Sequence, residues 1–167
     1  MMCGITGFVD RNGCTDFELN MHSIARMKDT LRHRGPDNSG VWADRTSRVF
    51  LGHTRLAILE LSEEGAQPMI SRSGRYCITF NGEIYNHLDL RRTYFQSSQW
   101  RGNSDTETLV EMIDKYGLNN TLSKITGMFA IAVWDMKKKK LSLARDRFGE
   151  KPLYYTTDVK KYGGFIF

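Results

Sequence analysis

The spacing of strand-like segments places the tightest limit on what this chain can fold into. Most of the chain beyond residue 124 consists of four such segments, namely residues 125–135, 141–146, 153–157 and 163–167. The connections between these segments are too short to hold a crossover helix. Parallel strands need a crossover of about a dozen residues, whereas antiparallel neighbours need only a short turn. We therefore expect antiparallel pairing in this part of the chain.

Amphipathic helices are predicted among the strands. Residues 16–31 carry apolar side chains at helical spacing, at Phe17, Met21, Ile24, Met27 and Leu31. A second helix is expected to begin at the capping-box pair Ser104 and Glu107 and to end at Gly117. Helices set among many short antiparallel strands indicate an α+β fold, in which the helices cover the outer faces of packed sheets.

Further strands are expected at residues 4–10 and 75–80, and a short helix at residues 86–95. The strand over residues 75–80 is predicted to end at Asn81-Gly82, because this dipeptide is typical of tight hairpin turns.

The composition is that of an ordinary globular domain. Of the 167 residues, 40% are hydrophobic and 26% are charged, values at which a single packed core forms. The longest apolar run, residues 128–134, is far shorter than the roughly twenty residues that span a bilayer. The N-terminus lacks the basic and apolar regions of a secretory signal. We therefore expect one cytoplasmic domain without a membrane partner.

The formal net charge of +5 does not by itself indicate a nucleic-acid partner. Lysines and arginines are scattered, apart from the run Lys137–Lys140, whereas nucleic-acid binding is typical of clustered basic residues. Because this run separates two strand-like segments, we interpret it as a solvated hairpin tip in preference to a phosphate-binding patch. We expect no nucleic-acid partner.

The chain has three cysteines, Cys3, Cys14 and Cys77. They show no Cys-x-x-Cys pair and no metal-ligand spacing, so we expect neither a disulfide framework nor a metal site. Cys77 is expected in the core. Cys3 is a candidate nucleophile, although its position alone favours the buried start of a strand.

Five short motifs follow one another along the chain. They are Cys3-Gly4-Ile5, residues 32–37 (RHRGPD), residues 52–58 (GHTRLAI), residues 81–86 (NGEIYN) and residues 104–107 (SDTE). In this order they resemble the class II glutamine amidotransferases, and the Gly35-Pro36-Asp37 and NGEIYN versions resemble the asparagine synthetase branch of that family. Residues 127–130 and 145–155 are similar to the same branch, so the resemblance covers nearly the whole chain. Each motif alone is a weak indicator, but five in order are specific.

The resemblance implies both a fold and a reaction. The fold would be the four-layer αββα sandwich of the N-terminal nucleophile (Ntn) hydrolases, with two antiparallel sheets between helical layers, which agrees with the α+β layering predicted above. Cys3 would attack the side-chain amide of glutamine. The Asn81 side-chain amide and the Gly82 backbone N–H would bind the resulting oxyanion. The alternative for Asn81-Gly82 is the hairpin turn already mentioned.

The resemblance also assigns residues to the amino-acid end of glutamine. Arg55 would bind the α-carboxylate, because a guanidinium can donate two parallel hydrogen bonds, and Glu83 and Asp105 would bind the α-ammonium. Ile58 is the expected apolar contact. The alternatives are structural: Arg55 as a surface strand residue, Asp105 as a helix N-cap, and Glu83 as an acidic residue near a helix start.

The base for this reaction would be the α-amino group of Cys3, whose ordinary pKa is about 7.7 to 8.0. The family normally begins Met-Cys-Gly and loses one methionine, whereas Met1 and Met2 both precede Cys3 here. We interpret Met2 as the true start of translation; trimming by another protease and a Cys3 nitrogen that stays acylated are the alternatives. With this base in place, His53 and His33 are expected to be structural.

The same resemblance predicts the partners. L-glutamine would be the substrate, and its ammonia would cross to a C-terminal ATP-dependent synthetase domain that converts aspartate to asparagine. ATP and Mg²⁺ are expected only in that domain. Residues 1–167 are interpreted as a glutaminase domain cut before its C-terminal end, without a cofactor or metal, from a protein that could form a homodimer. The alternatives are another carboxylate acceptor, such as a sugar acid, and a catalytically inactive glutamine-binding domain.

Overall fold

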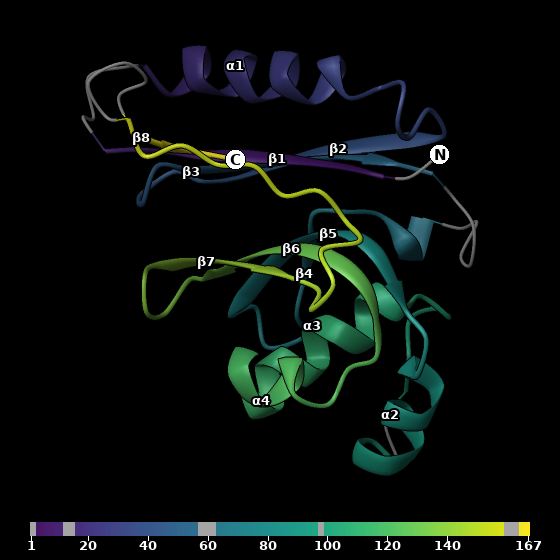
Figure 1. Ribbon diagram of the computed structural model, residues 1–167. Coiled ribbons are helices and arrows are strands. Elements are labelled where there is room, and N and C mark those ends of the chain that lie inside the picture. The colour runs from purple at the N-terminus through teal and green to yellow at the C-terminus, as the bar shows by residue number, and fades with distance from the viewer. Residues whose placement is uncertain (1–2, 12–15, 57–62, 97–98, 159–163) are drawn as a thin grey trace.

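The computed structural model describes residues 3–11, 16–56, 63–96, 99–158 and 164–167 (Figure 1). In chain order its elements are β1 (Gly4–Asp10), α1 (Phe17–Thr30), β2 (Asn38–Asp44), β3 (Val49–Arg55), a 3₁₀ helix (Glu63–Gly65), β4 (Met69–Ile70), β5 (Tyr76–Ile84), α2 (His87–Tyr94), α3 (Asp105–Tyr116), α4 (Leu118–Leu122), β6 (Gly127–Asp135), β7 (Lys140–Arg145) and β8 (Gly164–Ile166).

The strands of the described residues form two four-stranded sheets. Sheet A has the strand order β2-β3-β1-β8, and sheet B has the order β4-β5-β6-β7. All neighbouring strands pair in the antiparallel sense, which confirms the predicted pairing. The last strand, β8, does not join β6 and β7 but returns to sheet A and pairs with β1.

The two sheets stack face to face between two layers of helices (Figure 1). Helix α1 packs on the outer face of sheet A, and the helices α2, α3 and α4 lie on the outer side of sheet B. The four-layer αββα arrangement expected from the sequence is therefore confirmed.

Each boundary between layers is filled by apolar side chains. Ile24 of α1 is fully buried against sheet A, and Ile113 of α3 is fully buried against sheet B. The layer between the sheets contains Val49, Leu51, Cys77 and Trp134. The predicted helices over residues 16–31 and 86–95 correspond to α1 and α2, and the predicted core position of Cys77 is confirmed.

Strand β5 differs from its prediction in a way that matters for function. The predicted end at Asn81-Gly82 is wrong, because the strand continues to Ile84 and pairs Asn81 with Ala130 and Gly82 with Phe129. Gly82 permits this close pairing, since a Cβ atom at that position would lie 2.1 Å from the Met128 carbonyl oxygen. The hairpin-turn alternative for Asn81-Gly82 is therefore excluded.

The predicted strand over residues 153–157 is also wrong. Its described residues form only one isolated bridge, between Thr156 and Ile166. The physical reason lies upstream, at Asp146, whose carboxylate accepts hydrogen bonds from the backbone N–H groups of Phe148, Glu150 and Lys151. This carboxylate holds the chain in a tight turn directly after β7, so the next residues leave sheet B.

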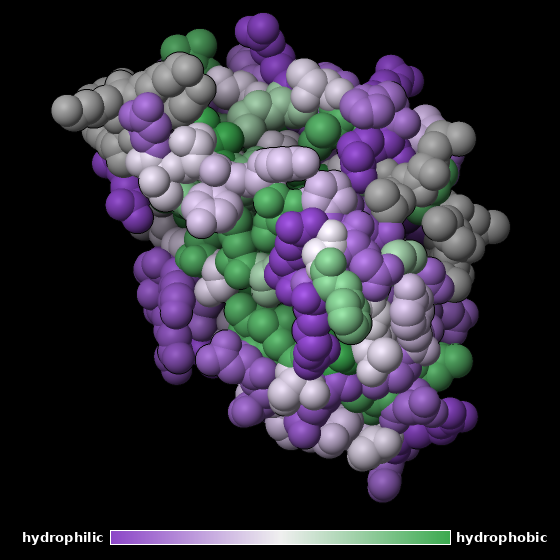
Figure 2. Space-filling view, viewed as in Figure 1, coloured by the Kyte–Doolittle hydropathy of each residue, from purple (hydrophilic) through white to green (hydrophobic). Residues whose placement is uncertain are grey.

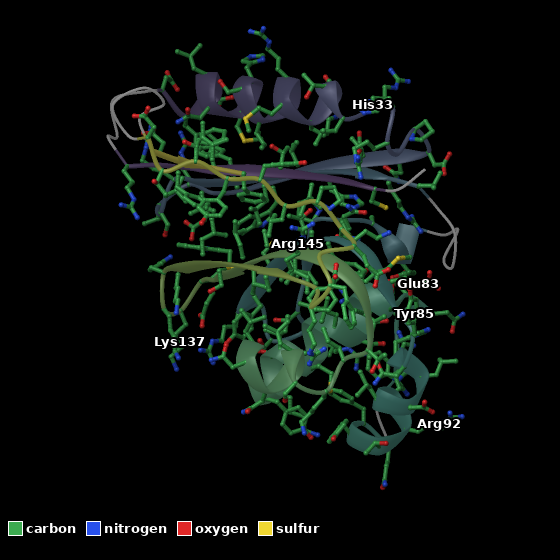
Figure 3. All side chains as sticks on the ribbon, in the orientation of Figure 1. His33, Glu83, Tyr85, Arg92, Lys137 and Arg145 are labelled. Atoms are coloured by element: carbon green, nitrogen blue, oxygen red, sulfur yellow. The ribbon has the colours of Figure 1, made fainter. Side chains whose placement is uncertain are left out.

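The lysine run lies at a hairpin tip, as predicted. Lys137–Lys139 lie in the turn between β6 and β7, Lys140 begins β7, and Lys139 adopts a positive φ of 51°. In Figure 3, Lys137 lies at the opposite end of the molecule from Glu83. The basic cluster is therefore remote from the residues expected to bind glutamine.

One edge of the sandwich exposes part of the layer between the sheets. Apolar side chains gather on the face where β7 and β8 lie (Figure 2). A groove of about 620 Å³ on this edge is lined by Val9, Trp134, Leu141 and Phe165 together with lysine and arginine side chains.

Across the described residues, no helix combines the length and apolar character needed to cross a bilayer.

Candidate active site

Sheet A directs Arg55 toward sheet B. Val49 and Leu51 of β3 lie in the apolar layer between the sheets, and alternate residues of a strand share one face. His53 and Arg55 therefore point into the same interlayer space. Arg55 is only 6% exposed, which excludes the alternative of a surface strand arginine.

Sheet B directs Asn81 and Glu83 toward sheet A. Cys77 of β5 lies in the same interlayer core, and the period of two places Asn81 and Glu83 on the same face of that strand. Asn81 is buried at 3% exposure, and Glu83 is half-buried. Glu83 and His33 lie at the end of the sandwich where the described chain begins (Figures 1 and 3).

Cys3 directly precedes β1 and is held by three contacts. Its Sγ atom accepts the Leu56 N–H at 3.4 Å, and its carbonyl oxygen accepts Arg34 Nε–H at 3.1 Å. The next amide, that of Gly4, donates to Thr54 Oγ1 at 3.1 Å. These contacts fix the nucleophile candidate between β3 and the RHRGPD segment. Sequence reasoning missed the part played by Arg34, although its motif had drawn attention to the segment.

The charged groups around Cys3 show which predicted residues lie near it. Burial raises the pKa of the Cys3 thiol above its ordinary value, the Leu56 N–H and the positive charge of Arg55 oppose this shift, and the negative charge of Asp105 adds to it. Arg55 and Asp105 thus act on the same sulfur although they are fifty residues apart in sequence. A thiol with a raised pKa stays protonated at neutral pH and needs a base.

His53 is poorly suited to be that base. It is fully buried, and its Nε2 atom lies 3.1 Å from the Phe80 carbonyl oxygen. Burial lowers the pKa of His53 to about 4, so the ring is neutral at physiological pH. A neutral ring that lies 3.1 Å from a carbonyl oxygen carries its proton on Nε2. This geometry supports the structural role expected for His53.

The backbone of Gly82 faces the open edge of β5. The N–H groups of Phe80 and Ile84 bond to side chains on the side away from β6, and the amides of alternate residues in a strand point to the same side. The Gly82 N–H therefore points to that edge as well, and among the described residues no hydrogen-bond acceptor for it is found. A fixed, available amide beside Asn81 suits an oxyanion donor.

Asp105 is the first residue of α3 and lies beside this edge. Its Oδ2 atom accepts the Ile84 N–H at 2.8 Å. Ser104 is the N-cap of α3, so the N-cap alternative for Asp105 is wrong. Burial raises the pKa of Asp105 to about 6, the N–H groups of Ile84 and Thr106 oppose this shift, and the negative charge of Glu83 adds to it. Glu83 and Asp105 thus lie near each other, and two neighbouring carboxyl groups form a natural site for a cation.

Comparison with known proteins identifies the family. A family model described as a glutamine amidotransferase domain matches residues 2–167. The chain belongs to this family.

Curated relatives of this amidotransferase domain are longer proteins. Asparagine synthetase [glutamine-hydrolyzing] 3 of Bacillus subtilis is 40% identical over 169 residues, which cover 99% of this chain and 26% of the relative. Asparagine synthetase B of Escherichia coli is 34% identical over 158 residues, with 94% and 27% covered. The amidase chry2 of Gibberella zeae is 35% identical over 167 residues, with 96% and 25% covered. The chain thus spans about a quarter of the length of these relatives.

A solved structure confirms the Ntn hydrolase fold of the domain. Glutamine phosphoribosylpyrophosphate amidotransferase from Bacillus subtilis, in complex with ADP and GMP, superposes with a TM-score of 0.73. The superposition covers 97% of this chain and 40% of the other, at 20% sequence identity. At this identity the likeness concerns the fold alone.

One predicted site residue, Ile58, lies outside the described residues, and no metal site was predicted. In the described part of the domain, no group of three or more His, Cys, Asp or Glu residues is arranged to hold a metal ion. The other predicted site residues lie together. Cys3, Arg55, Asn81, Gly82 and Asp105 are found at one end of the sandwich, with Glu83 beside them.

A cavity of about 620 Å³ adjoins this end of the domain. Its lining includes Arg34 and Asn81, residues of α1, and Leu153 and Tyr154. The Nη2 atom of Arg34 is buried, and no partner for it is found among the described residues. None of the three charged candidates for binding the amino-acid end of glutamine is among the described residues that line this cavity. Of the predicted site residues, only Asn81 is among the described residues that line the cavity.

Proposed function

We propose that this amidotransferase domain hydrolyses L-glutamine to glutamate and ammonia, with Cys3 as the nucleophile. The observation that carries the proposal is that Gly4, directly after Cys3 in sheet A, and Asn81 of sheet B line the same cavity. The free amide of Gly82 and the buried charges of Arg55 and Asp105 border the same region.

The chemistry follows the acyl-transfer pattern. The α-amino group of Cys3, once exposed, takes the thiol proton, and Sγ adds to the amide carbon of glutamine. The Asn81 amide and the Gly82 N–H bind the oxyanion that forms. The C–N bond then breaks, and the same proton leaves with the nitrogen as ammonia. Water, deprotonated by the α-amino group, finally adds to the γ-glutamyl thioester and releases glutamate. This sequence uses only groups of the protein and needs no metal or cofactor.

The charged residues select an amino acid over a simple amide. Arg55 would donate two hydrogen bonds to the α-carboxylate of glutamine. Glu83 and Asp105 would accept hydrogen bonds from its α-ammonium. An amide without these two charges would make neither set of hydrogen bonds, which lowers its affinity relative to glutamine.

The ammonia is proposed to serve a second, ATP-dependent domain that amidates aspartate to asparagine and binds ATP and Mg²⁺. The names of the longer relatives support this assignment. The cavity lined by Arg34 and Asn81 supports a separate exit for ammonia, because it meets the site away from the charges that would hold glutamate. A sugar acid or another carboxylate remains the alternative acceptor, since the residues that choose the acceptor would belong to the other domain.

The proposal is tested by two measurements on one purified sample: intact mass, which identifies the N-terminal residue, and glutamate release from glutamine. We expect glutamate and ammonia in equal amounts wherever Cys3 is terminal. A sample with terminal Cys3 that releases no glutamate contradicts the proposal and favours a glutamine-binding domain without activity.

The pH dependence of kcat/KM should show the ionisation of the Asp105 carboxyl. Its carboxyl must be ionised to pair with the substrate ammonium, and its pKa is about 6. The α-amino base already makes log kcat/KM fall with a slope of one below about pH 7.7. We therefore expect the slope to reach two below pH 6, and Asp105→Asn to keep a slope of one with kcat/KM lowered by about 10- to 100-fold.

Asp105→Asn should lower activity but raise the free energy of unfolding. A folded-state pKa above the ordinary 3.8 means that the folded protein binds this proton more tightly than the unfolded chain, so stability falls as pH rises from about 4 to 6 and the loss is complete at pH 7. Asn lacks this charge and can still accept the Ile84 N–H. Urea unfolding at pH 7 should show Asp105→Asn to be more stable by on the order of 2 kcal/mol. An unchanged or lower stability would show that burial of the Asp105 charge does not destabilise the folded protein.

A further inference from the structure

Among the strands that the structure describes, none pairs with β5 along the edge that carries Gly82. Strand β4 consists of only Met69 and Ile70, and it pairs with β5 at Ile78 and Cys77. From Phe80 onward, side chains bind the backbone in place of a strand. Gln67 Oε1 accepts the Phe80 N–H at 2.7 Å, and His53 Nε2 lies 3.1 Å from the Phe80 carbonyl oxygen.

The other side of Gly82 is held in the same manner. Asp105 Oδ2 accepts the Ile84 N–H, so the residues two before and two after Gly82 are both bound by side chains at this edge. The Gly82 N–H lies between them. A backbone amide whose neighbours on the same edge are fixed cannot turn without breaking these bonds. The bound residues thus determine where the Gly82 N–H points.

Gln67 is itself held in one orientation. It is 8% exposed, and its Nε2 atom donates to Thr106 Oγ1 at 3.2 Å. This bond leaves its carbonyl oxygen for Phe80 and links the β5 edge to the start of α3. His53, at 0% exposure, is similarly immobile. Both side chains come from outside sheet B, one from the segment before β4 and the other from β3.

We infer that Gln67 and His53 are positioning residues for the oxyanion donors Asn81 and Gly82. His53 binds the Phe80 carbonyl, which belongs to the peptide bond leading into Asn81, and Gln67 binds the Phe80 N–H of the preceding peptide bond. This inference rests on the proposed glutamine hydrolysis. Neither residue is among those proposed to bind glutamine, so their loss should act on the transition state and leave glutamine affinity nearly unchanged.

The test compares Gln67→Met with Gln67→Glu in the protein whose N-terminus is Cys3. Methionine keeps the volume but removes both hydrogen bonds. Glutamate keeps an acceptor for the Phe80 N–H, and its second oxygen can bond to the Thr106 hydroxyl in either protonation state. We expect kcat for glutamate release to fall by about 10- to 100-fold in Gln67→Met, with KM within threefold of the wild type, and to recover in Gln67→Glu. His53→Leu should change kcat in the same direction.

A second readout separates positioning from general disturbance. Alkylation of Cys3 by iodoacetamide proceeds without an oxyanion, so its rate, followed by mass at the Cys3 peptide, should be the same in Gln67→Met and the wild type. Unchanged kcat in Gln67→Met overturns the inference, and so does an equal fall in kcat and in the alkylation rate. If Gln67→Met does not fold, Thr106→Val decides, because it removes only the bond that orients Gln67 and should lower kcat by a few-fold. Absence of wild-type activity would instead refute the glutamine hydrolysis itself.

Discussion

Replacing Cys3 by alanine should lower kcat for glutamate release by roughly 10⁴-fold or more. Cys3 Sγ accepts the Leu56 N–H, and the next residue, Gly4, lines the same cavity as Asn81 of sheet B. Without the sulfur no thioester can form, and the oxyanion donors would have only water to act upon. Steady-state release of glutamate and ammonia, on protein whose N-terminus is confirmed by mass, measures the effect.

Cys77→Ala provides the matched control, because it makes the same chemical change in the core between the sheets. Cys77 is fully buried, and burial raises its thiol pKa far above the ordinary value, so it cannot supply a thiolate. We expect unchanged kcat and a loss of about 1 kcal/mol in the free energy of unfolding. Wild-type activity in Cys3→Ala would place the nucleophile elsewhere.

Retention of Met2 should mimic the loss of Cys3. A Cys3 nitrogen in a peptide bond is not basic, and the thiol, whose pKa burial raises, would keep its proton at neutral pH. A sample that retains Met2 is therefore expected to bind glutamine but to hydrolyse it at a rate close to that of Cys3→Ala. Equal rates with and without Met2 would contradict the α-amino group as the base.

Periodicity predicted those parts of the fold that local sequence determines. The helix over residues 16–31 follows from apolar side chains every three or four positions, and it occurs as α1. Strand β5 was predicted too short, because Asn-Gly favours turns locally while the long-range pairing with β6 keeps the strand extended. The pairing partners lie about fifty residues further along the chain, so a local pattern could not reveal them.

The site residues likewise fall into those that the sequence predicted and those that only the folded structure shows. The motifs predicted Cys3, Arg55 and Asn81, and the structure buries or half-buries all three at one end of the sandwich. The roles of Arg34 and Gln67 could not be predicted, because they consist of single hydrogen bonds to the backbone of distant segments. Neither residue type is characteristic of such a contact, and only the packing of the two sheets brings the partners together.

Glu107 was predicted only as half of a capping box, and the structure gives it a larger role. Ser104 Oγ accepts the Glu107 N–H at 3.4 Å, as predicted. The fully buried carboxylate, however, accepts hydrogen bonds from the side chains of Arg72 and Arg101 and from the backbone of Arg101 and Gly102. Arg91 lies 3.6 Å from it. Three cations thus share one buried anion.

Glu107→Ala should therefore lower the free energy of unfolding by about 3–5 kcal/mol, because it leaves buried arginine charge uncompensated. Total stability of a domain is about 5–15 kcal/mol, so the variant should unfold at much lower urea concentration. Asp89→Ala is the control, since Asp89 pairs with Arg92 on the exposed surface of α2, where such a pair contributes about 1 kcal/mol or less. Equal urea midpoints for the two variants would show that the arginine cluster around Glu107 does not stabilise the fold.

The pH dependence of this effect has a definite sign. Burial alone would raise the pKa of Glu107, but the N–H groups of Arg101 and Gly102 and the guanidinium groups outweigh it, so the pKa lies below its ordinary value. The stabilisation that comes from this charge is present above the ordinary pKa and is lost as pH falls through the lowered one. The difference in stability between the wild type and Glu107→Gln should accordingly be constant near neutral pH and shrink in acid. A difference that grows in acid would mean that the carboxylate is not held in its charged form.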